Sequence, residues 1–541
     1  MINGDVKNLS IRNQQNLSGT PSRRRSSETK EEPHDTITLQ GKSILDDHVI
    51  MPPNLNKISI NKTLVNFAES LEEKPATGQE KEWTIMFYMD GANDLEPHMA
   101  KAMLDLENVG SNDKVNLVSQ IARLSQDEVK KVLGEKYKDN PKALEEVKNH
   151  KTNVDGDWNG VRRYYIVNNQ DTASRHPYYT SNMEKNLYLT DISHPQTLAD
   201  FVSWGIKKYP AKHYMLVFMD HGAGWPGALN NDFSGYNGQM MSTPSIAEAL
   251  KTAEKTTNKK LDIVHFATCL MGSSEVAYQL KDSADYMIAS EEMGTTKALN
   301  YGPVLQKIND SLRNGGSSTK DLSRMIVNHF KENQDAFMTH AAIDLSMMEE
   351  VKNKIDELAL ALHNTATSVN LLKEIIGGVQ NYGNLSFEDT YRDYRDLKDF
   401  ANAIMLDDRI TDEKLKVAAF NVRLAVEQAV VGITPTATYT REETAGVSVE
   451  KQGRRKITRV NVIEEDIGGG GMSIYLPIEK KADYDKLKQD YSQLDIAQKT
   501  QWDEFIDKEV HSPSAADKGW TDLVRTLDKG INSPSGDGGK A

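Results

Sequence analysis

The sequence predicts an α/β fold in which a mainly parallel β-sheet is covered by helices on both faces. Short apolar runs of the kind that form strands buried on both faces recur between residues 83 and 289. Segments with helical spacing lie between most of these runs, and strands that alternate with helices indicate parallel pairing. The chain has 541 residues, enough for two or three domains whose cores need no disulfide.

Six apolar runs are the expected strands of this sheet. They are Trp83–Met89, Val115–Ile121, Arg163–Val167, His213–Met219, Leu261–Ala267 and Tyr286–Ala289. The segments between them that place apolar residues at helical spacing are Asp94–Val109, Pro195–Lys208, Pro244–Lys255 and Ser273–Leu280.

Composition changes along the chain predict its division into domains. The polar start, without helical or strand periodicity, is expected to be a disordered leader, and the Ser- and Gly-rich end a flexible tail. A highly charged stretch interrupts the α/β pattern and is expected to be a helical insertion. The expected parts are a leader at 1–80, the α/β domain at 81–318 with the insertion at 124–160, an α+β domain at 319–510, and a tail at 511–541.

Charge and cysteine content limit the partners. The formal net charge is -14, which argues against nucleic acid because phosphate binding needs a basic surface. The single cysteine excludes an intrachain disulfide and is typical of a reducing compartment. The first sixty residues hold no apolar run of signal-peptide length, and no stretch is long enough to span a bilayer. We therefore expect a monomer that is cytoplasmic or exported without a cleavable signal.

Two residues that could act together in thiol catalysis, a histidine and a cysteine, each lie just after one of the expected strands. His221 comes after the strand His213–Met219, and Cys269 comes after Leu261–Ala267. Ligand sites in open α/β sheets lie at the carboxyl ends of strands. A thiol protease needs a thiolate, an imidazole that takes its proton, and NH donors for the oxyanion. The pattern predicts His221 as general base and Cys269 as nucleophile.

The neighbouring residues extend this prediction. Gly222 has no Cβ and lets the backbone come close to a substrate carbonyl, so the backbone NH groups of Gly222 and Cys269 are the expected oxyanion donors. A helix beginning near Ser273 would place its positive end next to Cys269, and we expect this to lower the thiol pKa.

Structural explanations compete with the catalytic one. A lone cysteine in an apolar strand is more often an inert hydrophobic residue, and a single histidine is usually structural; His265, for example, is expected to be a packing residue. The conjunction favours catalysis, because both residues end predicted buried strands and lie 48 positions apart, close to the His-to-Cys separation of roughly 50 in caspase-type enzymes. The sequence contains no metal-binding Cys or His motif, P-loop or Gly-x-Ser-x-Gly elbow.

Several segments resemble, in order, those of the clostripain family of cysteine peptidases. They are Met86–Glu96, Arg162–Ile166, Gln196–Phe201, His221–Trp225, Cys269–Tyr278, Ala289–Glu292 and Gly471–Pro477. The resemblance covers about residues 83 to 510. It implies the caspase-like fold that this family shares with caspases, gingipains and separases. It also implies a catalytic dyad of His221 and Cys269 that does not strictly require a third member.

The chain departs from the family pattern at two places. Ala267 stands where the family usually has an acidic residue that helps to select Arg or Lys at the P1 position, so the P1 preference stays open. The loop after His221, from Gly222 to Ala249, contains no Lys or Arg, whereas family members are often activated by cleavage at a basic residue there. The two losses are consistent with each other, because an enzyme without basic specificity would have no basic site for self-cleavage.

The resulting hypothesis is a cysteine endopeptidase with a peptide or protein substrate. Asp94, Ala267 and Glu291 are the candidate substrate contacts, and Asn93 is expected to cap the helix that follows it. No metal or other cofactor is expected; calcium is conceivable in an acidic chain, but no loop has the regular carboxylate spacing of a calcium site. Two alternatives stay open: a catalytically silent binding protein of the same fold, and a thiol enzyme that transfers an acyl group or cleaves one dedicated protein.

Overall fold

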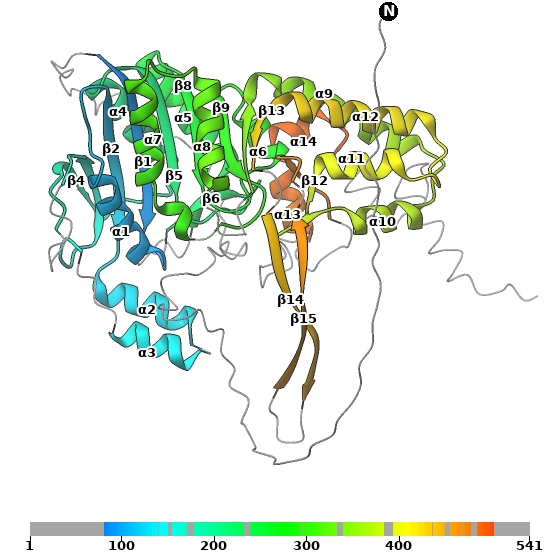
Figure 1. The fold of residues 1–541 in the computed structure, drawn as a ribbon, viewed down its shortest axis with the longest axis horizontal. Coiled ribbons are helices and arrows are strands. Elements are labelled where there is room, and N and C mark those ends of the chain that lie inside the picture. Colours follow the sequence, from blue (N-terminus) through cyan, green and yellow to red (C-terminus); the bar gives the residue numbers. More distant parts are fainter. Residues whose placement is uncertain are drawn as a thin grey trace, which may run out of the picture. The chain divides into compact units, whose positions relative to one another are not determined.

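The computed structural model describes residues 80–502, apart from 139, 150–153, 170–177, 232–238, 295, 333–338, 384–392, 435–436, 450–454, 468 and 478–483 (Figure 1). The expected tail lies outside the described residues, as does the expected leader except for Glu80.

Nine of the described strands form one sheet in the order β13-β10-β9-β8-β5-β1-β2-β3-β4. The five central strands are parallel to one another: β1 (Lys81–Gly91), β2 (Val115–Arg123), β5 (Ala211–Met219), β8 (Leu261–Ala267) and β9 (Ala284–Ser290). Two antiparallel strands extend each side: β3 (Gly160–Tyr165) and β4 (Asn182–Tyr188) beyond β2, and β10 (His340–Asp344) and β13 (Val430–Ile433) beyond β9. The predicted α/β fold with a mainly parallel sheet is confirmed.

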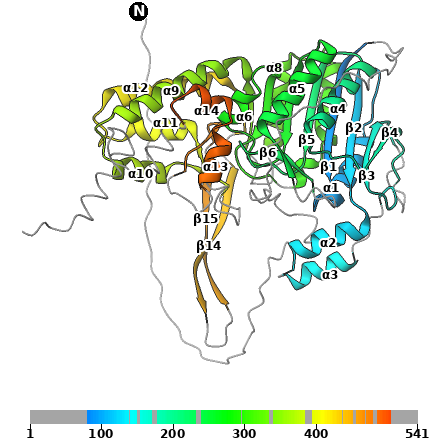
Figure 2. The same ribbon diagram turned by 180° about the vertical axis from the view of Figure 1, so that it is seen from behind.

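Helices cover both faces of this sheet, as Figures 1 and 2 show from opposite sides. The helices α4 (Pro195–Lys208) and α5 (Thr243–Thr257) pack on one face. The helices α1 (Glu96–Glu107), α7 (Gly302–Arg313) and α8 (Thr319–Glu332) lie on the other face.

The central strand β1 shows why the sequence gives this layering. Its residues from Trp83 onward are all buried, and successive side chains of a strand point to opposite faces. Tyr88 packs against Phe201 of α4 on one face, whereas Phe87 contacts Tyr301 at the start of α7 on the other. A strand that is buried at every position from Trp83 onward therefore packs against two helical layers at once.

The charged insertion contains two helices. α2 (Gln126–Lys136) and α3 (Pro141–Asn149) lie between β2 and β3 in the chain. Ser125 and Glu128 form a capping box that starts α2. Figure 1 shows the pair beyond the end of the sheet at which α1 begins.

The chain beyond residue 318 contributes to the main sheet as well as to a separate layer. Since β10 and β13 belong to the nine-stranded sheet, the sheet does not stop at the expected domain boundary. The α+β part contains a three-stranded sheet of β11 (Asn381–Tyr382), β12 (Tyr394–Asp396) and β16 (Ser473–Tyr475) and a hairpin of β14 (Ala437–Val449) and β15 (Arg455–Ile467). Its helices are α9 (Met348–Asn364), α10 (Val369–Gly378), α11 (Leu397–Leu406), α12 (Glu413–Ala429), α13 (Tyr484–Tyr491) and α14 (Asp495–Lys499).

This α+β part contacts the loops that follow β5 and β8. The backbone NH of Ser473 donates to the carbonyl oxygen of Gly272 at 2.9 Å. The Tyr394 hydroxyl donates to the Ala223 carbonyl at 2.7 Å and accepts from the Trp225 NH at 3.0 Å. The loops at the carboxyl edge are therefore held by segments that lie far away in the sequence. None of the helices in the described part of the chain is both long and apolar enough to span a membrane.

Candidate active site

His221 and Cys269 lie at the carboxyl edge of the sheet, where the strand order reverses. Of the parallel strands, β5 and β8 are neighbours and end at Met219 and Ala267, which are paired in register. β1 lies next to β5 on the other side, although β2 follows β1 in the chain. Ligands of open α/β sheets bind outside the strand ends at such a reversal.

The His221 imidazole has a carboxylate partner. Its Nε2 lies 2.7 Å from Oδ1 of Asp94, in the turn between β1 and α1. Since a carboxylate only accepts, Nε2 carries the hydrogen and the lone pair of the ring is left on Nδ1. Nδ1 is buried and has no hydrogen-bond partner among the described residues. This tautomer is the one that can accept a proton through Nδ1.

Asp94 was expected to contact substrate, which stays a prediction; in the structure its carboxylate contacts His221. Its second oxygen, Oδ2, forms an ion pair with the ammonium of Lys136 at the end of α2. Burial alone would raise the pKa of Asp94, but the charges of Lys136 and His221 hold it well below its usual range. Asp94 is therefore a carboxylate at neutral pH. No motif in the sequence connects it to Lys136, which is 42 positions away.

Cys269 is completely buried. Its sulfur accepts a hydrogen bond from the backbone NH of Gly294 at 3.3 Å. The expectation of a lowered thiol pKa is wrong for this structure, because burial raises the pKa of Cys269 to about 12. The helix that follows, α6 (Ser274–Gln279), has only six residues. The thiol is therefore neutral in this closed arrangement.

The backbone around Cys269 is strained and closely packed. Leu270, the next residue, has a φ of +62°, a conformation that costs a branched residue about 1 kcal/mol or more and is concentrated at functional sites. A Cβ at position 222 would lie 2.3 Å from the Cys269 carbonyl oxygen, so only glycine fits there. Gly222 and Cys269 are thus brought together, as their expected shared role as oxyanion donors requires.

Asn93 after β1 and Asp220 after β5 support the loops at this edge. Asp220 accepts from the Asn93 amide at 2.7 Å and from the NH of Asn230. Burial, and then the neighbouring Asp90, raise the pKa of Asp220 well above its usual range. Asn93 does not cap α1 as expected: its Oδ1 accepts from the NH of Leu95, which is itself the N-cap residue.

The other candidate substrate contacts are buried. Ala267 is the last residue of β8 and is 1% exposed. Glu291 accepts from the NH of Gly471 at 3.0 Å and from the Tyr382 hydroxyl at 3.3 Å. Its sequence neighbour Glu292 accepts from the NH of Gly383 at 3.0 Å, and burial raises the pKa of Glu292 to about 7. A role of Ala267 or Glu291 in substrate contact stays a prediction. His265, expected to be a packing residue, is fully buried beside Tyr301 and His340.

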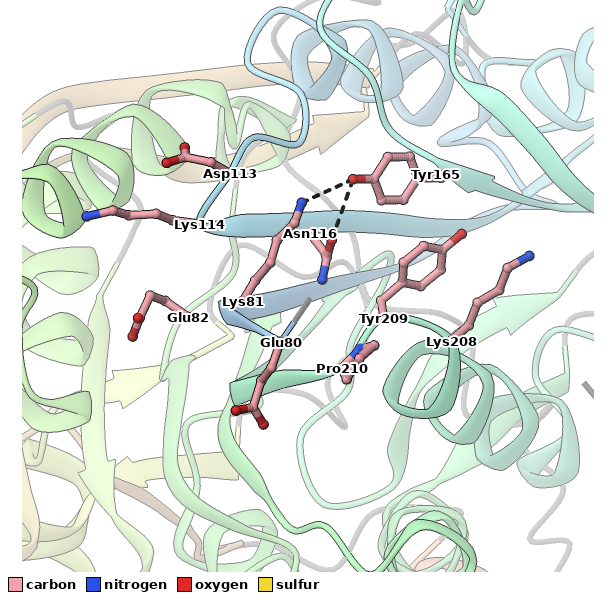
Figure 3. Close-up of a pocket in the computed structure, with 10 residues that line it drawn as sticks. All are labelled: Glu80, Lys81, Glu82, Asp113, Lys114, Asn116, Tyr165, Lys208, Tyr209 and Pro210. Carbon is pink, nitrogen blue, oxygen red and sulfur yellow. Dashed lines mark hydrogen bonds between the residues drawn. The ribbon is translucent and has the colours of Figure 1, made fainter. Parts of the chain in front are cut away.

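An open cavity of about 650 Å³ lies at the opposite edge of the sheet (Figure 3). Its lining includes Lys81 at the start of β1 and Tyr165 at the end of β3, which share a hydrogen bond of 3.3 Å. Strand residues rise about 3.3 Å each, so the length of β1 separates this cavity from Asp94 by roughly 30 Å. We do not assign the cavity to the dyad.

Comparison with known proteins finds one curated protein with a similar sequence and solved structures with a similar fold. The chain is 26% identical over 335 residues to clostripain from Hathewaya histolytica, a match that covers 55% of this chain and 59% of the relative. A secreted C11 cysteine protease from Bacteroides thetaiotaomicron, solved with an irreversible peptide inhibitor, has a similar fold: its TM-score is 0.50 at 16% identity, covering 78% of this chain and 99% of that one. The structure titled iotapain, from the same organism, gives a TM-score of 0.51 at 14% identity, covering 78% and 100%.

The model of the clostripain family matches residues 88–508. This range begins inside β1 and includes the other strands of the nine-stranded sheet, the three-stranded sheet, the insertion, and Asp94, His221 and Cys269. The resemblance inferred from the seven sequence segments is confirmed, and the chain belongs to the clostripain family.

Proposed function

We propose that this protein is a cysteine endopeptidase that cleaves peptide bonds through an acyl-enzyme on Cys269. His221 takes the thiol proton through Nδ1 and then gives it to the leaving amine, and water hydrolyses the thioester in a second step. Gly222 and Cys269 donate their backbone NH groups to the oxyanion. The observation that carries the proposal is the hydrogen bond from His221 to Asp94, which leaves Nδ1 as an acceptor beside the loop of the only cysteine.

Asp94 acts as a positioning residue in this mechanism. It orients the imidazole, and its negative charge stabilises the imidazolium that forms when His221 is protonated. The relative from Bacteroides thetaiotaomicron was solved with a peptide inhibitor, and a peptide substrate is the corresponding proposal for this chain. A silent binding protein is the competing function, but it offers no reason for the tautomer that Asp94 imposes on His221.

The P1 preference follows from Ala267. A cationic side chain in a largely desolvated pocket needs an anionic partner, because an unpaired buried charge costs several kcal/mol. Residue 267 supplies none, and Glu291 and Glu292 bond to backbone NH groups and a tyrosine. Asp94 is the candidate acid that holds a cation in this structure. We expect no strong preference for Arg or Lys, and a preference for Lys would point to Asp94 as its source.

A digest of a mixed peptide library tests the proposal. Wild-type protein should cleave it and Cys269→Ala should not, while each chain keeps its own full-length mass on storage. Activity should survive EDTA, since the mechanism uses no metal. Equal cleavage by the two chains would leave the silent binding protein as the better explanation, and calcium-reversible loss in EDTA would contradict the metal-free mechanism.

A further inference from the structure

The end of α2 reaches the candidate dyad. Lys136 is the last residue of this helix, and its ammonium is bonded to Oδ2 of Asp94, whose Oδ1 is bonded to His221. The Lys136 charge also acts on Cys269 and favours the thiolate, although burial outweighs this effect. One side chain of the insertion therefore acts electrostatically on the thiol and on the carboxylate that is bonded to the general base.

The four side chains become less exposed in order from Lys136 to Cys269. Exposed fractions are 23% for Lys136, 12% for Asp94 and 5% for His221, and Cys269 is fully buried. Lys136 is thus the most exposed of the four side chains, and the general base is held through Asp94 by a residue that solvent reaches.

The attachment of α2 is light enough to be reversible. The helix buries Val129 and Leu133, which are four positions apart and share a face with Lys136. Movement of the helix would separate Lys136 from Asp94 without disturbing the central sheet.

The contact also opposes catalysis electrostatically. When His221 takes the thiol proton, the imidazolium needs the negative charge of Asp94. Lys136 already neutralises that charge. The resting site therefore combines a neutral buried thiol with a carboxylate whose charge is shared.

Lys136 is not presented as a substrate for cleavage. The NH of Tyr137 donates to the Leu133 carbonyl at 2.9 Å, so the backbone at the end of α2 is still helical. The Lys136 peptide bond is therefore not held in the extended form of a bound peptide. A lysine side chain held by a helix can occupy the site and remain uncut.

We propose that α2 is an intramolecular inhibitor of this site: Lys136 blocks the dyad by binding Asp94, and the helix must withdraw before substrate enters. The proposal rests on the proposed peptidase function. It assigns the charged insertion a regulatory role. It also predicts that binding energy from a substrate or another partner is used to displace Lys136.

The test is the rate at which an electrophilic peptide probe labels Cys269 in the full-length chain. Lys136→Ala and Lys136→Met should be labelled at least about tenfold faster than wild type. Tenfold is the effect expected if separating Lys136 from Asp94 costs wild type about 1.4 kcal/mol. Lys131→Ala, an exposed position on the same helix, is the matched control and should label like wild type. Added salt should speed wild-type labelling and leave both Lys136 variants unchanged, because it screens the ion pair.

Lys136→Met keeps the aliphatic stem and carries the test if Lys136→Ala fails to fold by circular dichroism. Equal labelling of wild type and the Lys136 variants overturns the inhibitor proposal and leaves the peptidase intact. Slower labelling of both variants also overturns it, because Lys136 would then assist ionisation of the thiol. If no chain is labelled or cleaves peptides, Lys136 variants included, the peptidase proposal fails and the inhibitor proposal fails with it.

Discussion

Two buried polar clusters lie at the carboxyl edge of the sheet, and they differ in how their charges are arranged. In the first, Lys136, Asp94 and His221 form a chain in which a cation, an anion and an imidazole alternate. In the second, the carboxyl groups of Glu291 and Asp396 share the hydroxyl of Tyr382, at 3.3 Å and 3.0 Å. The first is partly exposed at Lys136, whereas Glu291, Tyr382 and Asp396 of the second are fully buried. Only the first combines opposite charges.

The second cluster joins two parts of the chain. Glu291 follows β9, whereas Asp396 ends β12, and both accept from the glycine turn before β16, at Gly471 and Gly470. Burial, and then Asp396, raise the pKa of Glu291 well above its usual range. Two carboxyl groups this close hold a proton rather than two charges. Alternating charge thus keeps Asp94 ionised beside His221 in the first cluster, and like charge makes the second a pH-sensitive connection.

The largest expected effect is at His221. His221→Ala should lower kcat/KM for peptide cleavage by about 10²–10⁴-fold through loss of acid-base assistance. The control is His213→Ala, near the amino end of the same strand β5, which stacks on Trp83 and should leave cleavage within about twofold. Steady-state kinetics of both variants measure the difference, and similar losses in the two would place the chemistry elsewhere.

A smaller effect is expected at Asp94. In a Lys136→Ala background, where the ion pair is already gone, Asp94→Asn should reduce kcat by about 10–100-fold with little change in KM, because it weakens the support of the imidazolium in the transition state. Asp94→Glu should restore part of the loss. A change confined to KM would assign Asp94 to substrate binding, as the sequence alone suggested.

The smallest effect concerns the second cluster and depends on pH. A carboxyl whose pKa is raised on folding contributes stability that is complete below its unfolded pKa of about 4.3 and is lost as pH rises through the folded value. Glu291→Gln removes this loss, so from pH 5 to pH 9 its free energy of unfolding should improve relative to wild type by about 1 kcal/mol or more. Urea unfolding at each pH measures this difference, with Glu350→Gln at an exposed position as control. If the free energies of unfolding of wild type and Glu291→Gln change in parallel with pH, Glu291 and Asp396 hold no shared proton.

The sequence predicted the elements that position the dyad because their apolar runs are continuous. β5 and β8 end where the pattern changes to His221 and Cys269, and the last residues of both strands agree with the prediction. Edge strand β4 was missed, since Asn182–Tyr188 is polar and mostly exposed and therefore lacks the signal of a buried strand. β10 was missed because it is a short strand among helices.

Only those features of the site that depend on neighbouring residues in the sequence were predictable. The close fit of Gly222 follows from residue size, but the Asp94–Lys136 pair depends on how α2 docks, which no local pattern encodes. The thiol pKa was predicted in the wrong direction for a related reason. A helix start can be inferred from sequence, whereas the burial that dominates at Cys269 is a property of the assembled loops.

The most direct test of the central claim uses the single cysteine of the chain. Wild type, Lys136→Ala and Cys269→Ala are incubated with an electrophilic peptide probe, and intact mass and peptide mapping are compared with the rate of peptide cleavage. The account predicts one probe per chain at Cys269, with cleavage falling in proportion to labelling and both absent in Cys269→Ala. Peptide cleavage that persists in Cys269→Ala, or in fully labelled protein, would contradict the account.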